Sequence, residues 1–221
     1  MKLSESPAAT VKLIGGRLCL DFVNSVGGRR PALPSKKGDE GAYLVREDKL
    51  NDYSDLLAWS RHTGLLTEGE VQKLIRESRQ RRAEAAPVFA RAIALREAMY
   101  RIFKAALNRT LPRQSDLEQL NQELTMAYGR VRLATGEENF VCEWTDTKNS
   151  LDRMHWLIAD SAAEFLATGD LTRLRECSGE DCGWLFEDTS KNRSRQWCDM
   201  RDCGNLAKVR RFRTRLHGDA T

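Results

Sequence analysis

Four of the six cysteines form two close pairs in the C-terminal part of the sequence. Four residues separate Cys177 from Cys182, and after a fifteen-residue spacer Cys198 and Cys203 repeat that spacing. Each pair can present two sulfurs from one tight turn, and four thiolates suit tetrahedral Zn²⁺ at about 2.3 Å per Zn–S bond. With all four positions filled by protein, none remains for water or substrate. The pattern therefore predicts a structural zinc site.

Two alternatives compete with zinc. Two disulfides would need an oxidising compartment, and residues 1–10 contain no apolar core of signal-peptide length. Iron–sulfur ligation is the other alternative, but the paired spacing and the basic segment that follows favour zinc. We therefore expect a cytoplasmic protein with a Zn²⁺ cofactor.

The residues around the cysteines predict the elements that position them. Residues 183–188 are strand-like and lie between the two pairs. After the second pair, Leu206, Val209, Phe212 and Leu216 recur at helical spacing, so a helix is expected there. Two cysteine turns with a strand between them and a helix after them form a treble-clef zinc finger.

The helix and the spacer are strongly basic. From residue 191 to residue 216 there are nine Lys or Arg but only two acidic residues. A cationic helix held by a metal can neutralise phosphates, and its arginines can contact guanine edges, which predicts nucleic-acid binding. The candidate residues are Lys191, Arg193, Arg195, Lys208, Arg210, Arg211, Arg213 and Arg215.

Three other interpretations of this region stay open. The basic helix can be a solvated surface, because charge runs usually are. The finger can be a purely structural element or a protein–protein interaction module. It can also bind RNA, with Trp184, Trp197 and Phe212 as stacking residues, although we expect these three to form the small core of the finger.

The motif around the cysteines resembles a known family. Cys-x4-Cys-Gly-Trp-Leu-Phe, followed by Trp-Cys-x-Met-x-x-Cys-Gly-Asn, is similar to the CGNR zinc finger, which in bacterial proteins follows an ABATE domain. The resemblance implies a stress-induced transcriptional regulator that binds DNA. One residue departs from the pattern, because Leu206 stands where the arginine of the family signature is expected.

The opening of the chain resembles the start of the ABATE domain, with Gly15-Gly16 leading into Leu-Asp-Phe-x-Asn. We expect a short strand here, with Leu18, Leu20 and Phe22 on one face, running into a helical turn. Asp21 and Asn24 are polar residues in this apolar segment. They either cap local backbone or contact a ligand, and a small-molecule effector is one possible ligand.

Helical spacing dominates the middle of the chain. A helix from about residue 51 is expected to end at Gly64, a capping box at Thr67 to begin a second one, and Pro87 to begin a third over 88–108. A capping box at Ser115 predicts a fourth helix, and alternation on both sides of residues 135–139 predicts a β-hairpin. A last helix is expected up to Gly169.

Length and composition complete the expectation. The chain has 221 residues, a net charge of +4 and no apolar run of membrane-spanning length. We expect an α+β protein with a mostly helical N-terminal domain (1–170), which senses an effector or dimerises, and a zinc-finger domain (171–221). The two remaining cysteines, Cys19 and Cys142, are expected to be buried thiols. His62, His155 and His217 have no metal-ligand spacing, and no catalytic motif is present, so an enzyme is not expected.

Overall fold

The computed structural model describes residues 5–31, 43–145 and 150–218, and backbone contacts divide the chain into two compact units. Unit 1 consists of Met1–Val11 and Lys49–Gly169, and unit 2 of Lys12–Asp48 and Asp170–Thr221. Residues 12–48 therefore group with the zinc finger and not with the helices that follow them. The expected domain division near residue 170 does not follow this grouping and stays a prediction about domain organisation.

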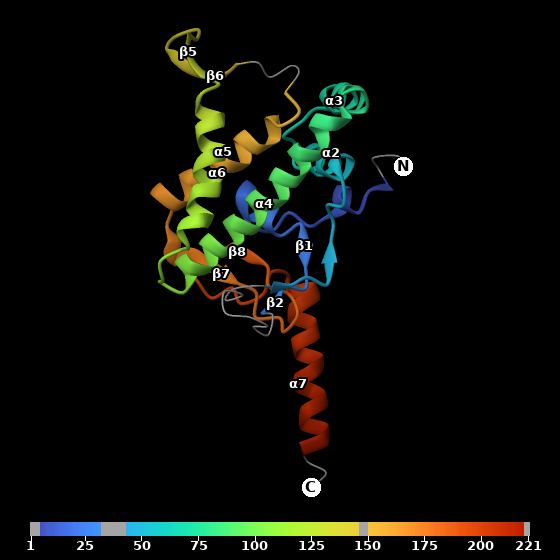
Figure 1. Cartoon of the computed structure of the whole chain (residues 1–221). Coiled ribbons are helices and arrows are strands. Elements are labelled where there is room, and N and C mark those ends of the chain that lie inside the picture. Colours follow the sequence, from blue (N-terminus) through green and yellow to red (C-terminus); the bar gives the residue numbers. More distant parts are fainter. Residues whose placement is uncertain (1–4, 32–42, 146–149, 219–221) are drawn as a thin grey trace. The chain divides into compact units, whose positions relative to one another are not determined.

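Unit 1 is helical apart from one hairpin (Figure 1). Helix α4 packs against α5, and α5 packs against α6. Its elements are the short 3-10 helix η2 (Pro7–Thr10), α2 (Tyr53–His62), α3 (Glu68–Gln80), α4 (Arg82–Leu107), α5 (Gln114–Tyr128), β5 (Val131–Thr135), β6 (Phe140–Trp144) and α6 (Arg153–Thr168). No helix in the described part of the chain is both long enough and apolar enough to cross a membrane.

Local signals fix several of these helix ends as expected. The carboxylate of Asp52 accepts a hydrogen bond from the backbone of Asp55 and begins α2. Thr67 and Glu70 form a reciprocal capping box at the start of α3. Gly64, with a φ of 78°, adopts the left-handed conformation that ends α2.

Two predicted helix starts are wrong. Helix α4 begins at Arg82, so Pro87 lies inside it and removes only one backbone hydrogen bond near the N-terminal end. Helix α5 begins at Gln114 without a side-chain cap. The expected cap residue Ser115 lies inside the helix, and its neighbour Asp116 is buried and accepts hydrogen bonds from Arg101 on α4.

The predicted hairpin is confirmed, with β5 and β6 antiparallel and Leu133 opposite Cys142. Trp144, at the end of the hairpin, stacks on Trp156 of α6 at a centroid distance of 5.9 Å. The expectation that Cys142 is buried is wrong, because both strands leave most of their side chains exposed. Cys19, in unit 2, is buried as expected.

A group of polar side chains joins three helices in the core of unit 1. Glu123 of α5 is 1% exposed and accepts two hydrogen bonds from Arg91 of α4, at 2.7 and 3.0 Å. The Nδ1 atom of buried His155, on α6, lies 3.4 Å from the same carboxylate. Burial alone would raise the pKa of Glu123, but the hydrogen bonds from His155 and Arg91 lower it overall. These contacts join three helices, and His155 is a core residue as the sequence suggested.

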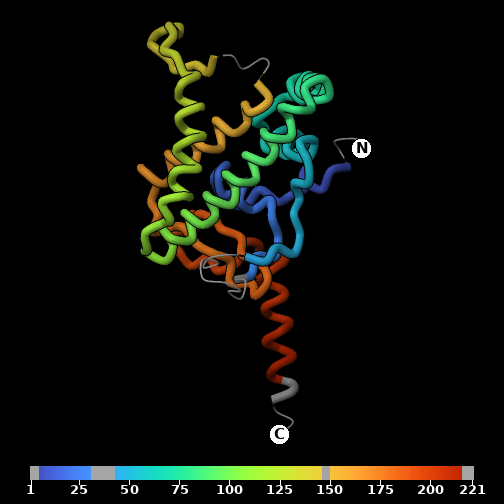
Figure 2. Tube along the Cα trace, in the orientation of Figure 1, coloured from blue at the N-terminus to red at the C-terminus, as the bar shows by residue number. Residues whose placement is uncertain are grey.

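Unit 2 is built from short elements and one long helix. Its elements are α1 (Leu18–Val23), β1 (Val26–Gly27), β2 (Arg30–Pro31), β3 (Tyr43–Leu44), β4 (Glu47–Asp48), the short helix η3 (Leu171–Arg173), β7 (Leu174–Glu176), β8 (Leu185–Glu187), the π-type turn η4 (Met200–Gly204) and α7 (Asn205–Gly218). The strands pair antiparallel as β1–β4, β2–β3 and β7–β8. The tube in Figure 2 shows α7 extending away from β7 and β8.

The segment 18–23 is helical throughout, so the expected strand there is wrong. Leu20, Phe22 and Val23 are all buried in α1, because the residues of this dense apolar run lie on or beside the buried face of the helix. The expected mostly helical α+β architecture, with a four-cysteine finger after it, is confirmed.

Candidate metal centre and nucleic-acid interface

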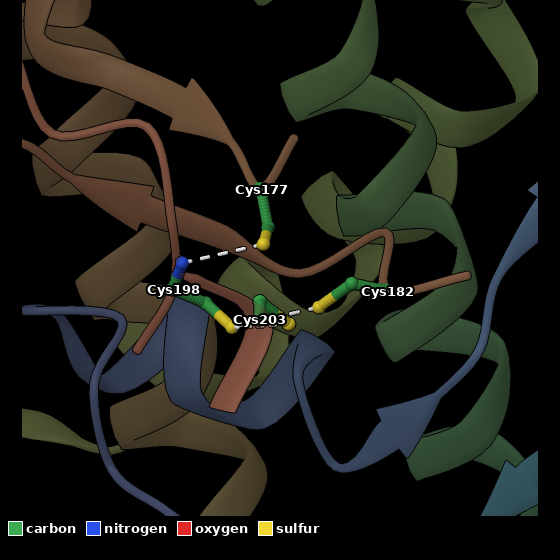
Figure 3. Close-up of side chains that lie close together, drawn as sticks. All are labelled: Cys177, Cys182, Cys198 and Cys203. Carbon is green, nitrogen blue, oxygen red and sulfur yellow. Dashed lines mark hydrogen bonds between the residues drawn. The ribbon is translucent and has the colours of Figure 1, made fainter. Parts of the chain in front are cut away.

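The four predicted zinc ligands converge on one point. Figure 3 shows the sulfurs of Cys177, Cys182, Cys198 and Cys203 turned toward one another. All four lie within 4.8 Å of one another, and Cys198 Sγ is 3.5 Å from the sulfurs of both Cys182 and Cys203. A tetrahedron with Zn–S bonds of about 2.3 Å requires sulfurs about 3.8 Å apart. The donor set and its spacing therefore fit zinc.

Backbone amides support the sulfurs from outside. The amides of Gly179 and Cys198 donate hydrogen bonds to Cys177 Sγ at 3.4 and 3.3 Å. A side chain at Gly179 would meet the sulfurs of Cys203 and Cys177 at 3.2 and 3.5 Å, so the turn comes close to the metal site. Donors of this kind stabilise negative charge on sulfur and orient the ligands.

When no cation is bound, the thiols do not ionise independently, because each one shifts the pKa of its neighbours. Hydrogen bonds from the Cys182 and Cys198 thiols lower the pKa of Cys177 far below its ordinary value. Contact with Cys177 raises the pKa of both Cys182 and Cys198. A divalent cation removes this conflict, because it stabilises all four thiolates together and releases their protons.

A small apolar core surrounds the metal site. Phe186 of β8 is fully buried beside Cys177 and Cys198, and Trp184 and Trp197 are half-buried against them. The indole nitrogen of Trp184 donates to the carbonyl of Val26 at 2.8 Å. For these two tryptophans the expected core role is confirmed.

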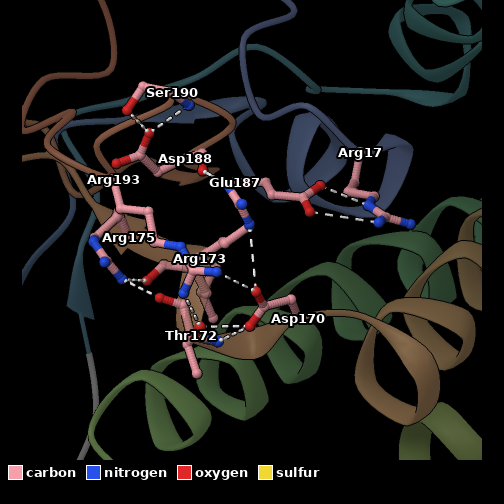
Figure 4. A network of polar contacts seen from close by, with 10 residues as sticks. Arg17, Asp170, Thr172, Arg173, Arg175, Glu187, Asp188, Ser190 and Arg193 are labelled. Atoms are coloured by element: carbon pink, nitrogen blue, oxygen red, sulfur yellow. Dashed lines mark hydrogen bonds and ion pairs between the residues drawn. The ribbon is translucent and has the colours of Figure 1, made fainter.

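The N-terminal segment of unit 2 completes the finger. The side-chain amide of Asn24 donates to the carbonyl of Leu185 at 2.7 Å and accepts from its N–H at 2.9 Å. The carbonyl of Gly15 accepts a hydrogen bond from the amide of Glu187 at 2.8 Å. Figure 4 shows the ion pair of Arg17 with Glu187, at 2.8 Å. One edge of β8 is thus covered by residues 15–24.

These contacts bear on the two candidate ligand-binding residues. Asn24 is buried, and both ends of its amide bind the Leu185 backbone. Asp21 accepts from the amide of Gly15 at 2.8 Å. Asp21 therefore binds local backbone, whereas Asn24 binds backbone that is 161 residues away, which nothing in the sequence indicated. A ligand contact by either residue stays a prediction.

The eight candidate nucleic-acid residues fall into two groups. Arg193 and Arg195 form contacts within the finger. Arg193 donates to Asp170 and Thr172, at 3.3 and 3.0 Å (Figure 4). Arg195 donates to the carbonyls of Ile14 and Cys198, and its guanidinium lies 4.1 Å from the centre of the Phe186 ring.

The other group is exposed to solvent. Lys191 lies on the spacer, and Lys208, Arg210, Arg211, Arg213 and Arg215 lie on α7. Arg210 forms an ion pair with Glu180 at 2.7 Å. Helix α7 carries five cations and no acidic residue, so no carboxylate of the same helix can pair with them. In the N-terminal segment of unit 2, Arg29 is buried and Arg30 forms an ion pair with Asp181 at 2.8 Å.

Three large apolar residues of α7 are exposed. Leu206, Val209 and Phe212 have exposed fractions of 58%, 47% and 63%. The expectation that Phe212 belongs to the finger core is therefore wrong, because α7 extends beyond the small core that the metal site organises. The Leu206 side chain, in place of the arginine of the signature, is on the first turn of this helix.

A groove lies between α7 and the first cysteine turn. It is bounded by Trp184 and Trp197, by the turn at residues 178–182, and by Ala207 and Thr214 of α7. Its charged lining is balanced, with four arginines (Arg46, Arg210, Arg211, Arg215) and four carboxylates (Glu47, Glu180, Asp181, Asp202). A groove without excess positive charge does not concentrate phosphate. The opposite side of α7 is the more favourable surface for nucleic acid.

Comparison with known families agrees with this geometry. The ABATE model, described as "Putative stress-induced transcription regulator", matches residues 16–169, and the CGNR zinc finger model matches residues 173–216. The chain belongs to the ABATE family and carries a CGNR zinc finger with Cys177, Cys182, Cys198 and Cys203 placed to hold its metal ion. No curated protein matches the chain.

Proposed function

We propose that this protein regulates transcription by binding DNA through helix α7 of its zinc finger. The observation that carries the proposal is the concentration of exposed cations on a helix that has no acidic residue and follows directly from the metal site. A DNA duplex carries one negative charge per about 1.7 Å of its axis, and it attracts such a helix by releasing condensed counterions. The regulatory role follows from the family description.

The phosphate contacts are assigned to α7 and not to the spacer arginines. Lys208 and Arg213 are exposed on the side of α7 that faces away from the charge-balanced groove. The guanidinium groups of Arg193 and Arg195, in contrast, already bind carboxylate, hydroxyl and carbonyl oxygens within unit 2. The zinc ion would hold the start of α7 and take no chemical step, since four protein ligands close its coordination sphere.

The proposal includes no catalytic activity and places the protein in the cytoplasm. Unit 1 would bind a small-molecule effector or form a homodimer, as the family resemblance implies. A protein-interaction module is the competing function, and the charge-balanced groove beside α7 is the observation that favours it.

Fluorescence anisotropy of the zinc-loaded protein with a labelled duplex, titrated with salt, tests the proposal. We expect tight binding at low salt, with log affinity falling linearly with log salt and a slope of roughly −2 for two phosphate contacts. Lys208→Ala and Arg213→Ala should weaken binding, whereas Arg132→Ala, which removes an exposed arginine from β5, should not. Absence of binding at every salt concentration would reject DNA binding and favour a protein partner.

A further inference from the structure

Helix α7 has two different sides. Ala207 and Thr214 line the groove beside the first cysteine turn. At about 100° of rotation per residue, Val209 and Phe212 fall on the side facing away from that groove. Their exposed fractions, 47% and 63%, agree with this placement. These two residues are here called the apolar stripe.

Cations border the apolar stripe on both sides. The same rotation places Arg213 along one border and Lys208 along the other. Both are exposed. The outward side of α7 is therefore apolar along its middle and positively charged at both edges. A complementary surface has an apolar floor between two anionic walls.

The major groove of DNA has this character where it contains thymine. Its walls are phosphates, and its floor presents the C5-methyl group of each thymine. The groove is about 12 Å wide and admits an α-helix. We propose that the apolar stripe of α7 lies on thymine methyl groups, so that the finger selects A·T-rich DNA. This inference rests on the proposed DNA-binding function.

Replacing thymine by deoxyuridine gives a direct test, because deoxyuridine lacks the methyl group but keeps the base pair and the phosphates. The zinc-loaded full chain is titrated against a short alternating A·T duplex and its A·U counterpart. We expect weaker binding to the A·U duplex, by about fourfold for each methyl group that is buried. The salt dependence should be the same for both, since no phosphate contact changes.

Variants on the two sides of α7 sharpen the test. Phe212→Ala and Val209→Ala should reduce the preference for thymine over deoxyuridine, while Ala207→Ser on the groove side should leave it unchanged. Val209 and Phe212 are exposed and Ala207→Ser is a small change, so zinc content and thermal stability should be preserved in each variant.

Two outcomes would overturn the inference. Equal affinity for the A·T and A·U duplexes would show that the stripe contacts no thymine methyl group, even though DNA binding itself stands. Tighter binding to phosphatidylserine vesicles than to any duplex, abolished by Phe212→Ala, would show that the stripe enters an anionic lipid surface. Loss of binding to every duplex would instead reject the proposed function on which the inference rests.

Discussion

The side chain of Asn24 binds Leu185 as a neighbouring β-strand would. Its Nδ2 donates to the carbonyl oxygen at 2.7 Å, and its Oδ1 accepts from the amide at 2.9 Å, across 161 residues of sequence. β8 pairs with β7 along its other edge, so this amide occupies hydrogen-bonding groups that an open strand edge would expose. Leu185 is fully buried, and without Asn24 its backbone groups would have no water to replace the lost partners.

Asn24→Ala should destabilise unit 2. The substitution leaves a buried carbonyl and a buried N–H without partners, at a cost of about 1–3 kcal/mol for each group. Thermal unfolding monitored by tryptophan fluorescence should show a lower midpoint, since Trp184 and Trp197 lie in the affected region. Asn192→Ala, on the exposed spacer, serves as the control and should leave the midpoint unchanged. Equal midpoints for the two variants would contradict the bridging role of Asn24.

Cys198→Ser should abolish tight zinc binding. Cys198 is the central ligand, with its sulfur 3.5 Å from those of Cys182 and Cys203. Since structural zinc sites contribute folding energy directly, the variant should also unfold at lower temperature. Metal analysis after dialysis should give about one zinc per chain for the unmodified protein and for Cys142→Ser, whose thiol lies on β6. Full zinc retention by Cys198→Ser would remove it from the ligand set.

Glu123→Gln should change how stability depends on pH. Burial tends to raise the pKa of Glu123, but its contacts with His155 and Arg91 lower it below the usual glutamate value. The charged form therefore stabilises the fold above the ordinary glutamate pKa, and this contribution is lost as the pH falls through the lowered folded-state value. At neutral pH we expect a loss of about 1–3 kcal/mol, because Arg91 loses its charged partner.

Unfolding midpoints measured from neutral pH down to acid test this expectation. The difference between the unmodified protein and Glu123→Gln should narrow as the pH falls below the ordinary glutamate pKa and through the lowered folded-state pKa of Glu123. Glu118→Gln, an exposed position on the same helix, should show little difference at any pH. A constant difference across the whole range would mean that charge on Glu123 contributes nothing.

The salt dependence of DNA binding should separate the two groups of basic residues. Lys208→Ala and Arg213→Ala should each make the log–log slope shallower by about 0.9, because each removes one phosphate contact. Arg193→Ala should leave the slope unchanged, since its guanidinium binds Asp170 and Thr172. A larger slope change for Arg193→Ala than for Lys208→Ala would move the interface from α7 to the spacer.

Patterns that depend on local spacing were predictable from the sequence. The cysteine pairs gave the metal ligands, and Thr67 with Glu70 gave a helix start that the structure reproduces. The hairpin around residues 135–139 followed from alternation and a polar turn. In each case the interacting groups are close in sequence, or their chemistry permits few other uses.

Features that depend on distant partners were not predictable. Ser115 and Glu118 have the spacing of a capping box, but α5 begins before them, and Asp116 between them pairs with Arg101 of α4. Arg195 has the charge of a phosphate contact, but the carbonyls of Ile14 and Cys198 and the Phe186 ring bind it instead. Phe212 has the hydrophobicity of a core residue, but the finger core ends before it. Spacing alone could not identify these competitors.

The covering of β8 by residues 15–24 sets an order of events during synthesis. This segment leaves the ribosome long before the cysteines do, and its partners on β8 lie 161 to 170 residues further along the chain. During translation the buried face of α1 therefore lacks its partners until β8 has been synthesised. The helices of unit 1 have all their partners available earlier. The metal site and the start of the chain would then become protected from proteases in the same late step.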